Sequence, residues 1–287
     1  MSRNLFNLII LGVILINLTL MLLDKLHRIK HSGKSLFADK WSLVHVWIAG
    51  QVIIAGMFVF FICSGLAFGI LSSWIFKSLH QDFFNDIVLL SLLPQNILLV
   101  FVPVFYIIAV YGEPLSAIGF RLSIKSRDAI KAFSFGLVLL GFGWSFNLLL
   151  NMTLRHFLGF RTYTHLVHLN NQLGNGNLVK NDIASPLLGV ILLVMGAVVA
   201  PIGEEFFFRG FLYNAAKKRY GVIAGIILSS AVFALVHGGP LLIPSVFPVG
   251  LVLAYAYEKS GNLWTSVIMH GTFNGLQLLL AILWKIT

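Results

Sequence analysis

The sequence has little cysteine and little charge. Its one cysteine, Cys63, lies in an apolar run, so neither an internal disulfide nor a cluster of thiolates for zinc can form. Only 10% of the 287 residues are charged, against roughly 25% in an ordinary soluble domain. A water-soluble fold is therefore excluded for most of the chain, and so is chemistry built on cysteine.

Several familiar hydrolase motifs are also missing. The sequence has no His-Glu-x-x-His zinc motif and no Gly-x-Ser-x-Gly nucleophile motif, and no Asp lies inside an apolar run to form an aspartyl dyad. Ser64 follows Cys63, but helix packing explains this stretch better than a serine nucleophile. Gly65 and Gly69 place small residues on one helix face, where a neighbouring helix can approach closely.

Long apolar runs dominate the chain. Hydrophobic residues make up 58% of it, and its mean hydropathy is +0.92. A helix of about 20 apolar residues crosses the ~30 Å hydrocarbon core, and in lipid the backbone polar groups must pair within the protein. We therefore expect an all-α, polytopic integral membrane bundle of about eight transmembrane helices, or seven if the first two regions are counted differently.

The eight apolar runs are residues 5–23, 41–76, 87–110, 132–151, 186–212, 222–237, 241–257 and 263–284. The first run is longer than the core of a secretory signal, and no small-residue cleavage site follows it, so it predicts a retained helix. The longest polar stretch, residues 151–185, predicts an exposed loop. We divide the chain into N-terminal membrane helices with basic loops, residues 1–130, and a C-terminal catalytic membrane core, residues 131–287, within one integral domain.

The formal net charge of +10 comes from 20 Lys and Arg against 10 Asp and Glu. These basic residues are spread over short segments between the apolar runs and form no continuous basic stretch. This pattern is typical of the loops that fix the orientation of membrane helices. We therefore expect the lipid bilayer as a partner, and no nucleic acid.

Two adjacent acidic residues stand apart from the other eight. Glu204 and Glu205 lie inside the run 186–212, where Arg209 is the only cation. Ionisable groups in a membrane helix are costly and indicate function by default. Glu205 and Arg209 are spaced i,i+4 and can pair, whereas Glu204 is turned about 100° away. We expect Glu205 to be structural and Glu204 to be free to exchange a proton; the alternative is that all three only hold helices together.

Two histidines extend this set of polar residues. His237 comes late in the sixth run and His270 lies within the eighth. Asn274 follows His270 at i+4 on the same helix face, and Phe233 precedes His237 by the same spacing and should pack beneath it. A rise of 1.5 Å per residue brings Glu204 and His237 to similar depths on either side of their connecting loop. We expect Glu204, His237 and His270 to surround one polar cavity.

This set of side chains allows two kinds of hydrolysis. A carboxylate acting as general base can activate water, while His and Asn donors stabilise the oxyanion that develops. Equally, Glu204, His237 and His270 could form a two-His-one-carboxylate site for a metal ion that activates a bound water. The residues alone leave both possibilities open.

The order of these residues resembles that of the CAAX-protease and bacteriocin-processing family of intramembrane proteases, also called the Abi family. The resemblance covers about residues 186–285. It rests on three motifs in order, which are Glu204-Glu205-x-x-x-Arg209, Phe233-x-x-x-His237 and His270-x-x-x-Asn274.

The resemblance implies roles for these residues and a function for the protein. Glu204 corresponds to the water-activating base, with His237 as its partner. His270 and Asn274 correspond to groups that bind the substrate carbonyl and stabilise the oxyanion, supported by Glu205 and Arg209. The eukaryotic branch of the family removes the last three residues of prenylated CAAX proteins, and bacterial members include proteins of peptide maturation and of bacteriocin self-immunity.

The resemblance therefore implies an intramembrane endopeptidase whose substrate is a membrane protein or a lipidated peptide, such as a prenylated CAAX protein. The implied location is a bacterial cytoplasmic membrane. Family members have been described both as metal-independent glutamate proteases and as metalloproteases, so the cofactor is either none or a divalent metal such as zinc. The alternative function is a non-catalytic membrane scaffold or a bacteriocin self-immunity protein.

Overall fold

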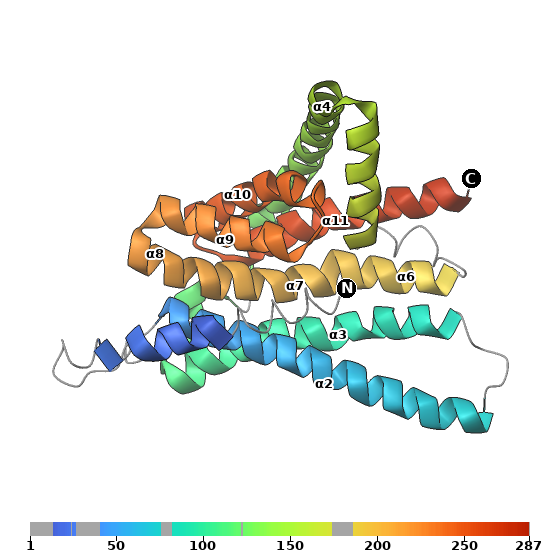
Figure 1. Cartoon of the computed structure of the whole chain (residues 1–287). Helices are drawn as coiled ribbons and strands as arrows, with labels where there is room; N and C mark the ends of the chain where they lie inside the picture. The colour runs from blue at the N-terminus through green and yellow to red at the C-terminus, as the bar shows by residue number, and fades with distance from the viewer. Residues whose placement is uncertain are drawn as a thin grey trace.

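The computed structural model describes residues 14–23, 25–26, 41–75, 82–121, 123–173 and 186–286 (Figure 1). Within these ranges the secondary structure is helical and no strand occurs. All eight predicted apolar runs are helical in their described parts, and an all-α membrane bundle is confirmed.

The N-terminal half of the bundle contains four helices and two short helical segments. They are a first helix (Ile14–Leu23), α2 (Leu43–Ile75), α3 (Asp82–Phe105), the π-helix η2 (Tyr106–Val110), the 3-10 helix η3 (Leu115–Ile118) and α4 (Ser126–Leu173). The remaining elements are α6 (Pro186–Val194), the π-helix η4 (Met195–Val199), α7 (Ala200–Glu205), the π-helix η5 (Phe206–Tyr213), α8 (Asn214–Tyr220), α9 (Val222–Val236), α10 (Leu242–Ser260) and α11 (Leu263–Ile286).

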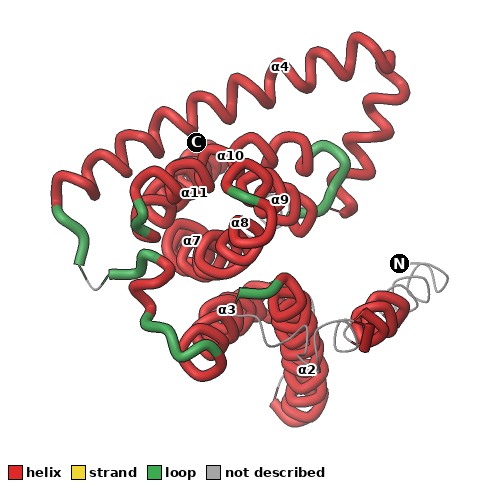
Figure 2. The backbone as a smooth tube through the Cα atoms, turned by 90° about the vertical axis from the view of Figure 1, so that its left-hand side faces the viewer, coloured by secondary structure: helices red, strands yellow, loops and turns green. Residues whose placement is uncertain are grey.

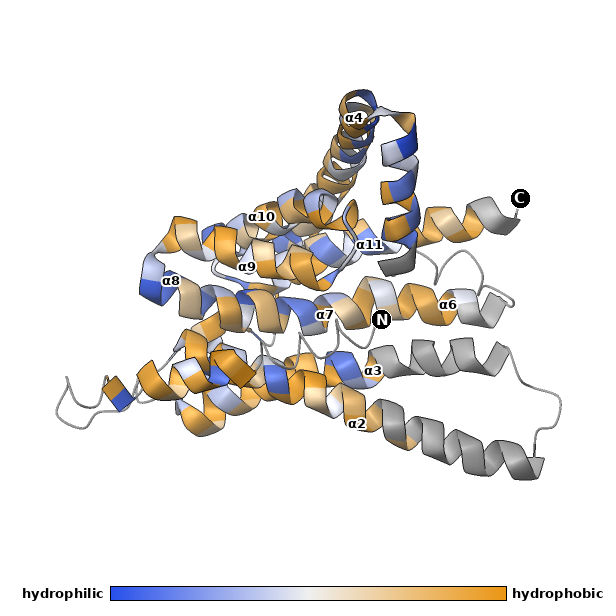
Figure 3. Ribbon diagram, viewed as in Figure 1, coloured by the Kyte–Doolittle hydropathy of each residue, from blue (hydrophilic) through white to orange (hydrophobic). Residues whose placement is uncertain are grey.

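Among the described residues, five helical segments are long and apolar enough to cross a membrane. They are Leu43–Phe60, Leu93–Val110, Ser126–Asn171, Gly189–Tyr220 and Leu263–Leu283. The first helix and α9 are shorter apolar helices over their described residues. Figure 3 shows hydrophobic residues along most of the bundle, while hydrophilic residues gather at α8 and on the second arm of α4. Large side chains such as Ile54 and Val138 are more than two-thirds exposed, as expected of a surface that faces lipid.

The central element of the bundle is the continuous series of helices from α6 to α8, which we call the central run. In Figure 2, α7 and α8 lie between α2 and α3 on one side and α9, α10 and α11 on the other, with α4 on the outside. All eight residues of η5 are buried, and Phe207, Phe208 and Phe211 pack in one core cluster with residues of α2 and α3. The wide turns of a π-helix are rare in proteins, but those that do occur are often found at functional sites. Glu204 and Glu205 end α7, and Arg209 lies in η5.

Two glycines let neighbouring helices approach this central run closely. A Cβ atom at Gly203 would come within 2.7 Å of Asn96 Oδ1 on α3. A Cβ atom at Gly271 would clash with the carbonyl oxygen of Ala197, so α11 packs directly against η4 at this level. The polar residues of α7 are thereby enclosed between α3 and α11.

The prediction of an exposed loop over residues 151–185 is wrong in its first part. α4 continues to Leu173, and only residues 174–185 lie outside the described part of the chain. Gly159 has φ 75° and ψ 160°, which divides α4 into two arms, and the second arm folds back toward the bundle (Figure 1). Its polar residues form tertiary hydrogen bonds: Asn170 Oδ1 accepts from the backbone N–H groups of Leu241 and Leu242, both at 3.0 Å.

Candidate functional site

A buried ion pair lies at the centre of the bundle. Glu205 and Arg209 are both completely buried, and Arg209 Nη1 donates to Glu205 Oε1 at 2.8 Å. Arg209 Nη2 donates to the carbonyl oxygen of Gly250 at 3.2 Å, and the guanidinium lies 4.4 Å above the ring centre of Phe233. The predicted i,i+4 pair is confirmed. Because each charge has a partner, the pair can persist where a lone charge could not.

His270 is attached to this ion pair. Its Nδ1 lies 2.9 Å from Glu205 Oε1, and because an ionised carboxylate only accepts hydrogen bonds, Nδ1 carries the proton. Nε2 then accepts from Asn274 Nδ2 at 3.1 Å, and the same amide nitrogen donates to the carbonyl oxygen of Gly196 at 3.3 Å. These contacts hold the imidazole of His270 and the amide of Asn274 in one orientation between α11 and the central run.

Glu204 is separate from the ion pair, as its helical position predicts. Its side chain is 17% exposed, and its Oε2 lies 3.8 Å from His270 Nε2, beyond hydrogen-bond distance. That oxygen is buried and has no hydrogen-bond partner among the described residues. The two adjacent carboxylates differ in their surroundings: Glu205 is completely buried in the ion pair, whereas Glu204 is partly exposed and lines a cavity.

His237 directly follows the last turn of α9. Its Nδ1 lies 2.7 Å from the carbonyl oxygen of Phe233, which can only accept, so Nδ1 donates and Nε2 is left as the acceptor. The rings of Phe233 and His237 are 4.6 Å apart between centroids. The prediction that Phe233 packs beneath His237 is confirmed, and the same ring also contacts Arg209 and His270.

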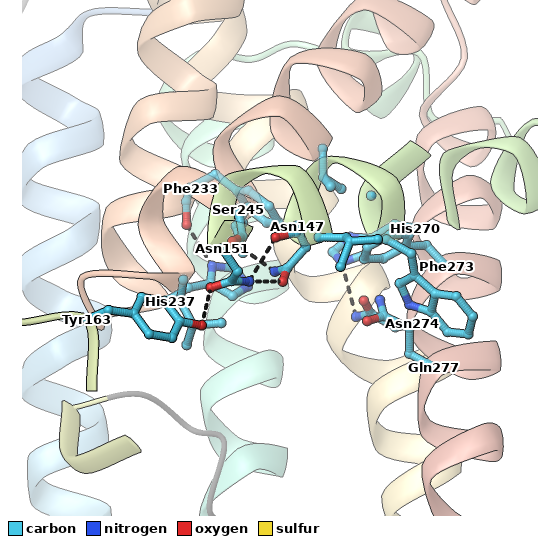
Figure 4. Close-up of a pocket in the computed structure, with 16 residues that line it drawn as sticks. Asn147, Asn151, Tyr163, Phe233, His237, Ser245, His270, Phe273, Asn274 and Gln277 are labelled. Carbon is cyan, nitrogen blue, oxygen red and sulfur yellow. Dashed lines mark hydrogen bonds between the residues drawn. The ribbon is translucent and has the colours of Figure 1, made fainter. Parts of the chain in front are cut away.

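Two cavities meet at His237. One, which we call the polar cavity, has a volume of about 630 Å³ and is lined by residues that include His237, His270 and Asn274 (Figure 4). The other, of about 680 Å³, is mostly apolar and is lined by Glu204, His237 and residues of α2, α3, η5 and α9. Glu204, His237 and His270 therefore do not line one cavity as expected: His237 lines both cavities, His270 only the first and Glu204 only the second.

The structure does not assemble the metal site that the sequence allows. No group of three or more His, Cys, Asp or Glu side chains that could hold a metal ion occurs within the described ranges. Nε2 of His270, the ring nitrogen nearer to Glu204, accepts a hydrogen bond from Asn274 Nδ2, and Nδ1 donates to Glu205, so this ring has no lone pair left for a metal ion. Glu204, His237 and His270 as arranged do not fit a zinc site.

A row of polar residues on the wall of the polar cavity is absent from the sequence-based prediction. Asn147 Nδ2 donates to Ser245 Oγ at 3.0 Å, Asn151 Nδ2 donates to the carbonyl oxygen of Asn147 at 2.8 Å, and Tyr163 Oη donates to Asn151 Oδ1 at 3.1 Å. All four residues line the polar cavity. One signal was available: Asn147 and Asn151 are spaced i,i+4 in an apolar run, where polar residues usually face the bundle interior.

Comparison with protein families supports the resemblance. The model of the type II CAAX prenyl endopeptidase Rce1-like family matches residues 186–276. This range contains every residue of the three motifs that carry the resemblance. No solved structure matches the chain.

Each of the curated relatives matches less than half of the chain. The membrane-embedded CAAX protease MroQ of Staphylococcus aureus is 32% identical over 100 residues, which are 32% of this chain and 40% of the relative. The UPF0177 protein YaiF of Lactococcus lactis is 32% identical over 119 residues, which are 41% of this chain and 52% of the relative. The putative membrane peptidase YdiL of Bacillus subtilis is 23% identical over 84 residues, which are 29% of this chain and 34% of the relative. The chain thus matches between about a third and a half of the length of these relatives.

Proposed function

Because residues 186–276 of this membrane protein form a domain of the Rce1-like CAAX prenyl endopeptidase family, we propose that the protein is an intramembrane endopeptidase. It hydrolyses a peptide bond of a membrane protein or of a lipidated, CAAX-type peptide, with Glu204 activating the attacking water. One observation carries the proposal: Glu204 is partly exposed, lines a cavity together with His237 and lies 3.8 Å from His270 Nε2, while Glu205 is completely buried in an ion pair.

In the first step Glu204 acts as general base. A water molecule donates one O–H to the carboxylate of Glu204 and the other to Nε2 of His237, which is the free acceptor of that ring. With both hydrogens directed to the protein, a lone pair of the water oxygen faces the substrate carbonyl carbon. As the C–O bond forms, the proton passes to Glu204. A general base positioned in this way typically contributes 10² to 10⁴-fold to a rate.

Asn274 is the donor best placed for the developing oxyanion. Its amide nitrogen is held by the carbonyl oxygen of Gly196 and by His270 Nε2. A substrate carbonyl oxygen that takes the place of Nε2 as acceptor receives the N–H without any movement of the amide. Glu205 and Arg209 act through His270, since they fix the imidazole that holds Asn274. They are positioning residues in this mechanism.

The tetrahedral intermediate then collapses. Glu204 returns its proton to the nitrogen of the leaving amine, the C–N bond breaks, and a carboxylic acid and an amine are released. Water is the only co-reactant. Glu204 takes up one of its protons and returns it, so the atoms balance without any other reagent.

The test replaces the base with an isosteric amide. The Glu204→Gln protein should lose at least about 100-fold of the rate of cleavage, measured by mass spectrometry of peptides from membranes that carry either protein. Asp128→Asn is the matched control, because Asp128 is exposed in the first turn of α4 and lies away from both cavities. Normal processing by Glu204→Gln would contradict the mechanism, whereas no cleavage by either protein would support the scaffold or self-immunity alternative.

A further inference from the structure

The polar cavity contains more polar groups from a membrane helix than helix packing needs. Asn147 and Asn151 lie in the span Ser126–Asn171, and their side chains join Ser245 of α10 and Tyr163 of the second arm of α4 in one hydrogen-bonded row. Figure 4 shows this row on one side of the cavity, with His270 and Asn274 on the other. Polar groups in a membrane-spanning helix are costly unless they face a polar cavity or a ligand.

The polar cavity has no fixed charge on its wall. Among the described residues that line it there is no Asp, Glu, Lys or Arg. A ligand with a carboxylate or phosphate would call for Arg or Lys, and a cationic ligand for a carboxylate. Amides and hydroxyls instead offer both donors and acceptors without charge, which matches the N–H and C=O groups of a peptide backbone.

The cavity also has the size and the place for such a ligand. Its volume of about 630 Å³ is within the usual range for ligand sites. His237 and Asn274, which the proposed mechanism places next to the scissile bond, line it directly. A peptide entering from the membrane must find partners for its backbone groups, because lipid offers none.

We propose that the polar cavity binds an uncharged, extended segment of the substrate on one side of the scissile bond. Asn147, Asn151 and Ser245 pair with the backbone amides of that segment. The inference rests on the proposed function and narrows its substrate class: the chain to be cut continues through the cavity as uncharged polypeptide and does not end there in a free carboxylate.

The first test uses three labelled peptides and needs no variant of the cavity. All three begin with the same apolar segment and continue with residues chosen from Ala, Ser and Gly. One ends in an amide, one ends in a free carboxylate two residues after the apolar segment, and one has the sequence of the first with an Asp replacing one residue after the apolar segment. Binding to the protein in lipid nanodiscs is measured by fluorescence anisotropy, with Glu204→Gln used to prevent cleavage. The uncharged amide should bind about 10-fold more tightly than either charged peptide, and equal or tighter binding of a charged peptide would overturn the proposal.

The second test changes the wall of the cavity. Asn147→Leu should weaken binding of the uncharged peptide about 5- to 10-fold, since one hydrogen-bonding group is lost. Tyr163→Phe should weaken it less, since it removes only a hydroxyl and keeps the ring. Ser134→Ala is the matched control, because Ser134 is an exposed polar residue of the same helix that bonds only to the carbonyl oxygen of Ile130 and does not line the cavity.

These binding measurements separate the two proposals. If the protein cleaves nothing but still discriminates among the three peptides, the endopeptidase proposal fails and the cavity proposal stands. If cleavage depends on Glu204 but Asn147→Leu and Tyr163→Phe bind the peptides as the unchanged protein does, the cavity proposal is overturned. The unfolding temperature of each variant in detergent shows whether a loss of binding reflects the cavity or the fold.

Discussion

At the scale of single residues, the two adjacent glutamates illustrate how position on a helix separates roles. Glu205 is completely buried with Arg209 and His270 as partners, whereas Glu204 is 17% exposed and lines the second, mostly apolar cavity. The chemistry of the two side chains is identical, so the difference comes from the 100° rotation between neighbouring residues. Because of this difference, we expect substitution of Glu205 to affect stability and substitution of Glu204 to affect activity.

Glu205→Gln should destabilise the protein by about 3–5 kcal/mol, because it leaves the buried guanidinium of Arg209 without a counter-charge. Glu204→Gln should leave stability nearly unchanged while it removes activity. Unfolding in a denaturing detergent, followed by circular dichroism, compares the two. Equal destabilisation by both substitutions would show that Glu204 is part of the structural ion cluster and not a free base.

Asn274→Leu should lower kcat about 10²- to 10³-fold with little change in KM, because an oxyanion donor acts mainly in the transition state. The measurement is the steady-state rate of a peptide that the unchanged protein cleaves. Asn214→Leu is a useful comparison, since Asn214 also bonds to carbonyl oxygens of its helix but lies outside both cavities. A rise in KM with unchanged kcat would assign Asn274 to substrate binding alone.

The sequence alone predicts the relations within one helix but few of those between helices. Spacing of i,i+4 predicts that Glu205 pairs with Arg209 and that Phe233 packs beneath His237, because helix geometry alone brings these residues together. The contact of Glu205 with His270 spans 65 residues and depends on how α11 is rotated against the central run, which no local pattern specifies.

At the scale of elements, α4 departs most from the sequence-based expectation. Polarity after residue 151 predicts a loop, but the chain remains helical and changes direction at Gly159. Asn170 of the second arm bonds to the start of α10, and Asn147 of the first arm bonds to Ser245, 98 residues away. The contact of Tyr163 with Asn151 in the polar cavity could not be predicted because it depends on this turn.

The second arm of α4 is attached next to His237. Asn170 Oδ1 accepts from two backbone N–H groups at the start of α10. Gly239, with φ 78°, packs against the side chain of Asn170. Asn170→Ala should therefore cost about 1–3 kcal/mol, and it should increase hydrogen exchange at the amides of Leu241 and Leu242. Thr164→Ala on the same arm is the control, because that hydroxyl is exposed and bonds only within its own helix. Unchanged exchange at the two amides would mean that the arm does not hold this loop.

At the scale of the whole molecule, a second polar cluster joins α8 to α10 at the end of the bundle away from the polar cavity. Lys217 Nζ lies 2.6 Å from Glu258 Oε2, and Tyr213 Oη donates to the same oxygen at 2.6 Å. Asn214 and Tyr257 extend the cluster, and Tyr257 Oη donates to the carbonyl oxygen of Ile118 in η3. The cluster thereby ties the central run, α10 and the segment before α4 together.

The cluster predicts a dependence of stability on pH. Partial burial raises the pKa of Glu258, but hydrogen bonds from Lys217 and Tyr213 outweigh burial and hold that pKa below its usual value. A carboxyl group with a lowered pKa in the folded protein stabilises it above the unfolded pKa of about 4.3. This stability is lost as the pH falls through the folded pKa. Because Lys217 is 38% exposed and its charge is screened by water, the effect should be at most about 1 kcal/mol.

The unfolding temperature in detergent, measured between pH 7 and pH 3, tests this prediction with Lys217→Met as the comparison. The unchanged protein should lose stability relative to Lys217→Met as the pH falls below about 4.3, because only the unchanged protein has the Lys217–Glu258 pair to lose. Lys218→Met is the control for removing a neighbouring positive charge, since Lys218 lies in the same turn of α8. If the Lys217→Met and Lys218→Met proteins follow the same curve, the ion pair between α8 and α10 contributes nothing, and Glu258 is held through the hydrogen bond from Tyr213 of η5 alone.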